Sequence, residues 1–143
     1  RGAAAQREKP MKVLGTLLFV SAVLVASGVA TAAELGPRTS SAAGVTVKVT
    51  PKRIAPDAAT WEFDVVLDTH SQDLSDDLAK ISVLLDAKGG RHMPLAWEGA
   101  PSGGHHRAGV LRFKGLGTLP DAIELQIRRP GEAAPRAFRW NLR

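Results

Sequence analysis

The stretch that decides the fold of this chain is TWEFDVVLD, residues 60–68. Apolar side chains occupy every second position of it: Trp61, Phe63, Val65 and Leu67. Successive side chains of a β-strand point to opposite sides, so this spacing gives one apolar face and one face that carries the acidic residues. The stretch therefore predicts a half-buried strand.

The same two-residue period recurs in six other short segments of the chain. We expect further strands at residues 45–50, 79–86, 91–96, 110–114, 121–128 and 136–142. The connections between them are rich in Gly, Pro and polar residues, as loops are. A single helical turn capped by Ser75 is expected near residues 74–78. No segment has the length and the 3.6-residue period of a long helix.

Seven short strands favour an all-β domain over residues 45–143, because two antiparallel sheets packed face to face bury all seven apolar rows. We expect a seven-stranded immunoglobulin-like or fibronectin-like sandwich. The alternative is a cupredoxin-like Greek-key barrel. Residues 34–44 are small and polar and are expected to be a flexible lead-in.

An export signal is expected over residues 11–33. Lys12 follows Met11, residues 13–30 carry no charge, and Ala30-Thr31-Ala32 has the small-x-small pattern of a cleavage site. Cleavage after Ala32 or Ala33 would release a periplasmic or secreted protein. The alternative is an uncleaved anchor, which would leave a membrane-tethered protein facing the periplasm. Residues 1–10 are interpreted as an upstream segment or as sequence added for expression, and they carry no weight in the fold.

Charge and cysteine content narrow the function classes. The chain has a formal charge of +5, but residues 34–143 hold 15 basic and 13 acidic side chains, so the expected mature domain is nearly balanced. Without a basic block, it lacks the signature of a nucleic-acid-binding protein. The chain contains no cysteine, which excludes disulfides, thiolate metal sites and thiol catalysis.

Three of the four histidines are expected at one end of the domain. In an antiparallel sandwich successive connections alternate between the two ends, so the second, fourth and sixth connections, residues 69–78, 97–109 and 129–135, share an end. His70 lies in the first of these connections, and His105 and His106 lie in the second. His92 follows a turn at the other end and should lie apart.

Imidazole and carboxylate groups together suit copper or zinc ions. The candidate metal ligands are His70, His105, His106 and Asp68. The candidate supporting or rim residues are Asp73, Trp97, Glu98 and Arg107. Gly103 and Gly104 would allow the backbone to place the histidine pair without strain.

The alternative interpretation is structural. Neighbouring side chains diverge in an extended chain, so His105 and His106 cannot easily point the same way. One of them would then pack against Trp97, and the other would bond a backbone carbonyl. Trp97 itself could stack on a sugar or cover the histidines, but a cover over the edge of the core is the commoner use of such a residue.

No catalytic motif is complete. No serine lies in a G-x-S-x-G turn, and no glycine loop is followed by a helix that could hold a phosphate. We therefore expect a protein that is not an enzyme.

Two elements of the sequence resemble an uncharacterised family of small exported bacterial β-sandwich domains. They are Asp68-Thr69-His70-Ser71 and Trp97-Glu98-Gly99 followed by Gly103-Gly104-His105-His106-Arg107. The resemblance covers residues 45–142 and implies no activity. Its two motifs lie in the two loops that strand parity brings together.

The sequence thus favours an exported module that binds copper or zinc through loop histidines. The alternative is a non-metal interaction module of the cell envelope, with an envelope or secreted protein as its partner. A membrane is expected as a partner only if the signal segment stays uncleaved.

Overall fold

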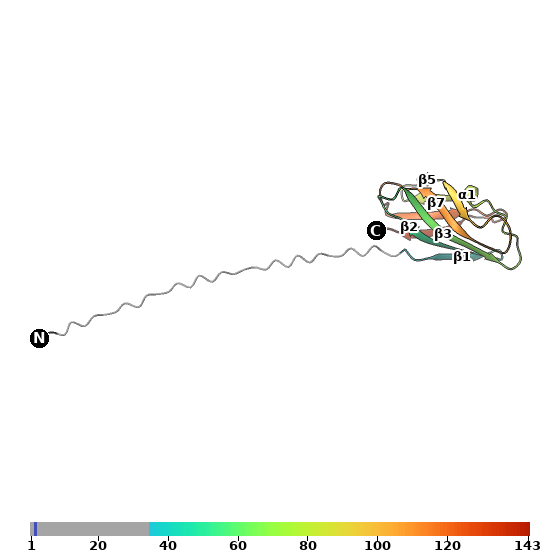
Figure 1. Ribbon diagram of the computed structural model, residues 1–143, viewed down its shortest axis with the longest axis horizontal. Coiled ribbons are helices and arrows are strands. Elements are labelled where there is room, and N and C mark those ends of the chain that lie inside the picture. Colours follow the sequence, from blue (N-terminus) through green and yellow to red (C-terminus); the bar gives the residue numbers. More distant parts are fainter. Residues whose placement is uncertain (1, 3–34) are drawn as a thin grey trace. The chain divides into compact units, whose positions relative to one another are not determined.

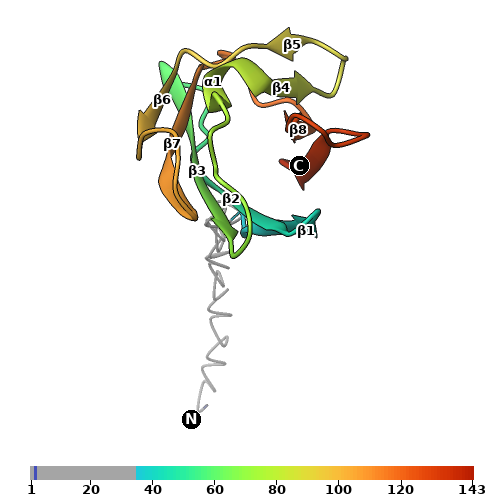
Figure 2. The ribbon, with the colours of Figure 1, turned by 90° about the vertical axis from the view of Figure 1, so that its right-hand side faces the viewer.

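The structure is a computed structural model, and it describes Gly2 and residues 35–143. These residues form two antiparallel sheets that face each other across the interior (Figures 1 and 2). The first sheet has the order β1-β2-β3-β7-β6, with β1 Arg38–Ala42, β2 Val45–Arg53, β3 Thr60–Thr69, β7 His106–Lys114 and β6 Ala96–Gly99. The second has the order β5-β4-β8-β9, with β5 Arg91–His92, β4 Ser82–Asp86, β8 Ala122–Ile127 and β9 Arg136–Asn141.

The predicted strand at residues 60–68 is the centre of the first sheet. It lies between β2 and β7, and all four of its alternating apolar side chains are fully buried. Phe63 packs edge-on against Phe113 of β7, with ring centroids 5.6 Å apart, and reaches Trp140 of β9 at 5.8 Å. The first contact joins neighbouring strands of one sheet, and the second, with the rings tilted at 41°, joins the two sheets.

The all-β sandwich is confirmed, and the closed-barrel alternative is wrong because the strands of residues 35–143 separate into two sheets. The sandwich has nine strands rather than seven. Strand β1 lies inside the expected lead-in. The strand expected at residues 91–96 is limited to β5, and β6 starts at its last residue and continues into the expected loop 97–109. Strands β1 and β6 are edge strands with few buried side chains, so neither has the apolar alternation that marks the other strands.

The helical turn lies later than expected. Helix α1 spans Leu78–Ile81, and its N-cap is Asp77, whose carboxylate accepts a hydrogen bond from the backbone N–H of Lys80. Ser75 is therefore not the cap. Residues 79–81, expected in a strand, belong to this helix.

The predicted export signal, residues 11–33, lies outside the described residues. Within residues 35–143, no helix is long and apolar enough to cross a membrane.

Residues 34–143 are expected to fold without the segment that precedes them. The buried apolar cluster is formed by side chains between Val45 and Trp140, and a segment with its own core is an independent folding unit. A protein of these residues should show a β-type circular dichroism spectrum and one cooperative thermal transition. A non-cooperative melt would contradict this expectation.

Candidate functional site

Two of the loops that strand parity assigns to one end of the sandwich meet there. The backbone N–H of Leu74 donates to the carbonyl of Gly104 at 2.9 Å, and the N–H of Gly103 donates to the carbonyl of Leu74 at 2.8 Å. Gly103 and Gly104 both have positive φ, at 111° and 78°, a conformation that other residues adopt only with strain. The expected role of the two glycines ahead of the histidine pair is therefore confirmed.

We call the group Asp68, His70, His105 and His106 the histidine rim. Asp68 on β3 and His106 on β7 are direct partners across the two strands, and the Nδ1 atom of His106 contacts the carboxylate of Asp68. Their side chains are 56% and 64% exposed. The backbone N–H of Thr69 donates to the carbonyl of His105 at 2.9 Å, which holds that residue beside the end of β3.

The rim is not a preformed metal site. Within the described part of the chain, no three His, Cys, Asp or Glu side chains gather closely enough to hold an ion. The structural alternative is not realised either, because His70, His105 and His106 are all exposed rather than turned into the core. The rim therefore has one carboxylate–imidazole pair, Asp68–His106, and two further exposed imidazoles that do not form a three-ligand group with it.

The supporting residues divide into two kinds. The Asp73 carboxylate accepts a hydrogen bond from the N–H of Gly104 at 2.8 Å, so it shapes the loop that carries the histidines. Glu98 points elsewhere and pairs with Arg112 at 2.9 Å. Trp97 lies on β6, packs against the core and donates from its ring to the carbonyl of Ala100. The interpretation of Trp97 as a cover over the core edge is confirmed.

Arg107 lies under the rim and is only 2% exposed. Its guanidinium donates to the carbonyl oxygens of Leu74, Asp76 and Ala100 at 3.1, 2.7 and 3.3 Å, and it lies 5.5 Å from the ring centroid of Trp97. Because these carbonyls belong to two loops, one buried cation joins both of them. Arg107 is a structural residue and not an exposed part of the rim.

A second group of buried charges joins the third loop to the same end. Arg129 pairs with Asp76 at 2.6 Å, and Glu132 pairs with both Arg129 and Arg136. Hydrogen bonding from Arg136 holds the pKa of Glu132 below its ordinary value, and this effect exceeds the opposing effect of burial. Sequence reasoning missed this group, although Arg136 shares the two-residue period of Phe138 and Trp140 and so had to face inward.

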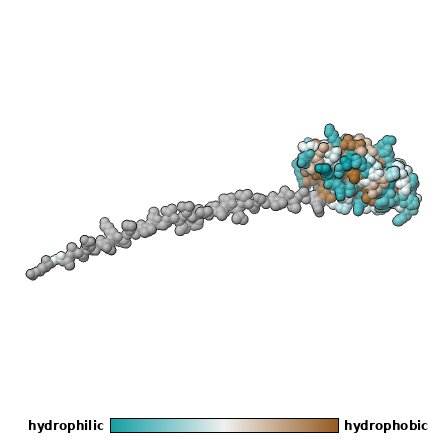
Figure 3. Space-filling view, in the orientation of Figure 1, coloured by the Kyte–Doolittle hydropathy of each residue, from teal (hydrophilic) through white to brown (hydrophobic). Residues whose placement is uncertain are grey.

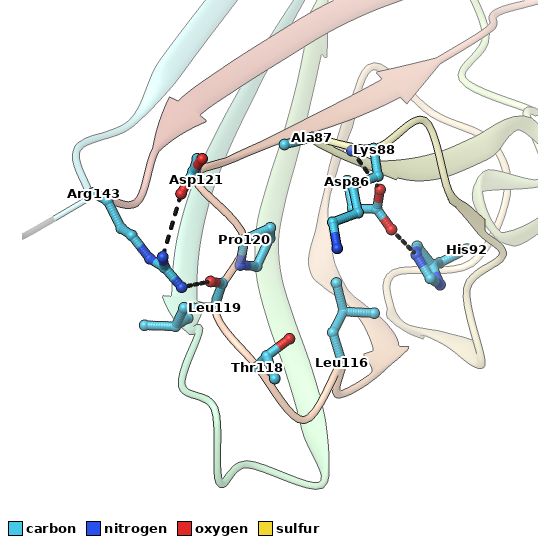
Figure 4. A pocket seen from close by; sticks show the side chains of 10 residues that line it. All are labelled: Asp86, Ala87, Lys88, His92, Leu116, Thr118, Leu119, Pro120, Asp121 and Arg143. Carbon is cyan, nitrogen blue, oxygen red and sulfur yellow. Dashed lines mark hydrogen bonds and ion pairs between the residues drawn. The ribbon is translucent and has the colours of Figure 1, made fainter.

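His92 lies at the other end of the strands, as expected. It borders a hollow of about 560 Å³ that is also lined by Asp86, by Leu116 and Leu119 of the β7–β8 connection, and by Arg143 (Figure 4). The Nε2 atom of His92 is 3.0 Å from the Asp86 carboxylate, which also accepts backbone hydrogen bonds from Lys88 and Gly90. Hydrogen bonding from His92, and to a lesser degree from the Gly90 backbone, holds the pKa of Asp86 below its ordinary value. The Asp86 carboxylate is therefore already hydrogen-bonded to three groups, which lie in β5 and in the turn between β4 and β5.

Comparisons with protein-family models, with curated proteins and with solved structures found no match to this chain. The family resemblance and the immunoglobulin-like or fibronectin-like assignment therefore stay predictions.

Replacing Arg107 by alanine should lower the free energy of unfolding by roughly 2–4 kcal/mol, because three carbonyls lose a buried donor and a cavity remains. Arg112→Ala serves as the control, because its surface ion pairs contribute less than about 1 kcal/mol. Urea unfolding of the two variants measures the difference. Equal losses would show that Arg107 has no special role.

Glu132 should make the protein sensitive to acid. Its pKa is lowered in the folded state, so its contribution to stability is present above the unfolded value, near 4.5, and is lost as the pH falls through the lower folded value. The melting temperature of the wild type should therefore fall more steeply below about pH 4.5 than that of Glu132→Gln. Parallel pH profiles of the two proteins would contradict this assignment.

Proposed function

We propose that this protein is an exported, non-catalytic module that binds a transition-metal ion, copper or zinc, at the histidine rim. The observation that carries the proposal is the contact between Asp68 and His106, which lie 38 residues apart in the chain. It occurs at the end of β3, where His70 follows Thr69 directly and the carbonyl of His105 is hydrogen-bonded to the Thr69 N–H.

The Asp68–His106 pair suits a metal ligand held in one orientation. Metal-binding imidazoles usually turn their other ring nitrogen toward a carboxylate, which fixes the ring and raises its basicity. With Nδ1 of His106 directed at Asp68, the Nε2 atom is the one available to an ion. His70 and His105 are the nearest further imidazoles in the chain, and both are exposed.

Binding at this rim requires the exposed side chains to rotate, because the described residues contain no ready group of three ligands. Exposed side chains change rotamer within nanoseconds, so the rearrangement is fast and involves no core residue. Copper(II) is favoured over zinc, since imidazole and carboxylate ligands bind it more tightly.

A second candidate is a non-metal interaction module that presents the same rim to an envelope or secreted protein. The lack of a preformed ligand group within residues 35–143 favours it. Exposed histidines beside a carboxylate can donate hydrogen bonds to a partner without any ion.

Calorimetric titration of residues 34–143 with Cu²⁺ and Zn²⁺ tests the metal proposal. We expect binding at micromolar concentrations at neutral pH, with weaker binding below about pH 6, because imidazoles bind metal only when neutral. The double variant His70→Ala, His105→Ala and the single variant His106→Ala should each lose most of this binding. Asp68→Asn should weaken it by roughly 10- to 100-fold.

His92→Ala is the matched control, because this histidine is also paired with an aspartate but lies at the opposite end of the strands. It should bind the ion as the wild type does. Absence of binding, or binding unchanged in the double variant, would overturn the metal proposal and leave the interaction module.

A further inference from the structure

The outer side of the four-stranded sheet carries a basic hollow. It measures about 290 Å³, and the cations at its border are Lys80, Arg91 and Arg128. No acidic side chain borders it; the remaining lining residues are Ile81, Ser82, Val83, Met93, Gln126 and Pro135. The charge of the domain as a whole is nearly balanced, but this part of its surface is positive.

On the outer side of the five-stranded sheet, two of the cations are matched by carboxylates, whereas Lys48 and Lys114 are exposed without an ion pair among the described residues. Lys52 pairs with Asp64 at 3.4 Å, and Arg112 pairs with both Glu62 and Glu98. At the basic hollow, Lys80 pairs only with exposed Asp77. Arg91 and Arg128 have no carboxylate partner within the part of the chain that the structure describes.

Exposed apolar Met93 borders this hollow, and exposed Leu95 follows two residues later in the chain. Met93 is 58% exposed and Leu95 is 61% exposed, and they are the large apolar residues that residues 35–143 leave in solvent. They lie in the connection from β5 to β6, on either side of Pro94, and Met93 also borders the hollow. The backbone N–H of Leu95 donates to the carbonyl of Arg112 on β7 at 2.7 Å, so Leu95 lies just before β6, two residues beyond Met93. On the face that Figure 3 displays, apolar and hydrophilic residues are interspersed.

We infer that this surface, defined by Lys80, Arg91, Arg128, Met93 and Leu95, docks on an anionic phospholipid bilayer. Basic side chains bind the phosphate groups and the negative surface potential of such a membrane. Adjacent apolar side chains enter the boundary between headgroups and acyl chains. A soluble polyanion would use the cations and leave Met93 and Leu95 without a role. The inference does not depend on metal binding at the histidine rim.

Sedimentation of residues 34–143 with lipid vesicles tests this inference. We expect binding to vesicles of phosphatidylcholine mixed with phosphatidylglycerol and little binding to phosphatidylcholine alone. Arg91→Glu with Arg128→Glu should weaken binding at least about tenfold, since each basic residue near an anionic surface contributes about fivefold. Met93→Ser with Leu95→Ser should weaken it severalfold with no change in charge.

The control is Lys48→Glu with Lys114→Glu, which changes the net charge equally on exposed residues of the other sheet. It should bind nearly as the wild type does. Circular dichroism checks the fold of each variant, and Arg91→Gln with Arg128→Gln replaces the charge reversal if that variant unfolds.

Three results would overturn the inference. The first is no binding to the anionic vesicles. The second is an equal loss in the control variant, which would mean that net charge alone acts. The third is full binding by the Met93→Ser, Leu95→Ser variant together with equal binding to dextran sulfate, which would identify an acidic polymer or protein as the partner.

Discussion

Buried guanidinium groups that donate to backbone carbonyls hold one end of this sandwich together. Arg136 donates to the carbonyl oxygens of Ser40, Ala42 and Val45 at 2.9, 2.7 and 2.7 Å, and Arg107 does the same for two other loops. Loops of a small domain without disulfides have few other means of fixing their backbones. A planar, permanently charged fork with five donors satisfies carbonyls that lie apart from one another, whereas a lysine has three donors on a single nitrogen.

The exposed rim depends on this buried layer. The loop that carries His105 is fixed by Arg107 from below and by Asp73 and the Leu74 backbone from the side. Removing a charge from such a layer leaves unpaired groups in the interior, whereas changing an exposed histidine leaves the fold untouched. The same end of the molecule thus combines a hydrogen-bonded backbone with exposed side chains, and this combination suits a binding site.

Much of the fold could be predicted from the sequence, because strands that bury one face show it in their two-residue period. Residues 60–68 and 136–142 are examples. Strands β1 and β6 lie at sheet edges and bury little, so that period is missing. The turn between β1 and β2 could not be predicted either. Ala43 takes a positive φ of 48° there, at a position where Gly or Asn would be expected.

The candidate site could be predicted only in part. Counting connections placed His70 and His105 in loops at the same end and His92 apart from them, and both placements agree with the structure. The direction of each side chain could not be predicted, because it depends on where the strands end. Strand β7 begins at His106, four residues earlier than expected, and this extension is what sets His106 opposite Asp68. Arg129 and Arg136 were missed, and Arg107 was expected at the rim rather than beneath it, because charged residues are uncommon at inward positions.

Strand β1 has a consequence for the solubility of the molecule. It contributes no buried side chain, yet it pairs along β2 from Val45 to Val49 and is joined by Arg136 and Arg38 to the opposite sheet. Were it absent, the valine-rich strand β2 would be an open edge, available to strands of neighbouring molecules. A short, serine- and threonine-rich strand is a poor template for such pairing. β1 therefore acts as a protective border against aggregation.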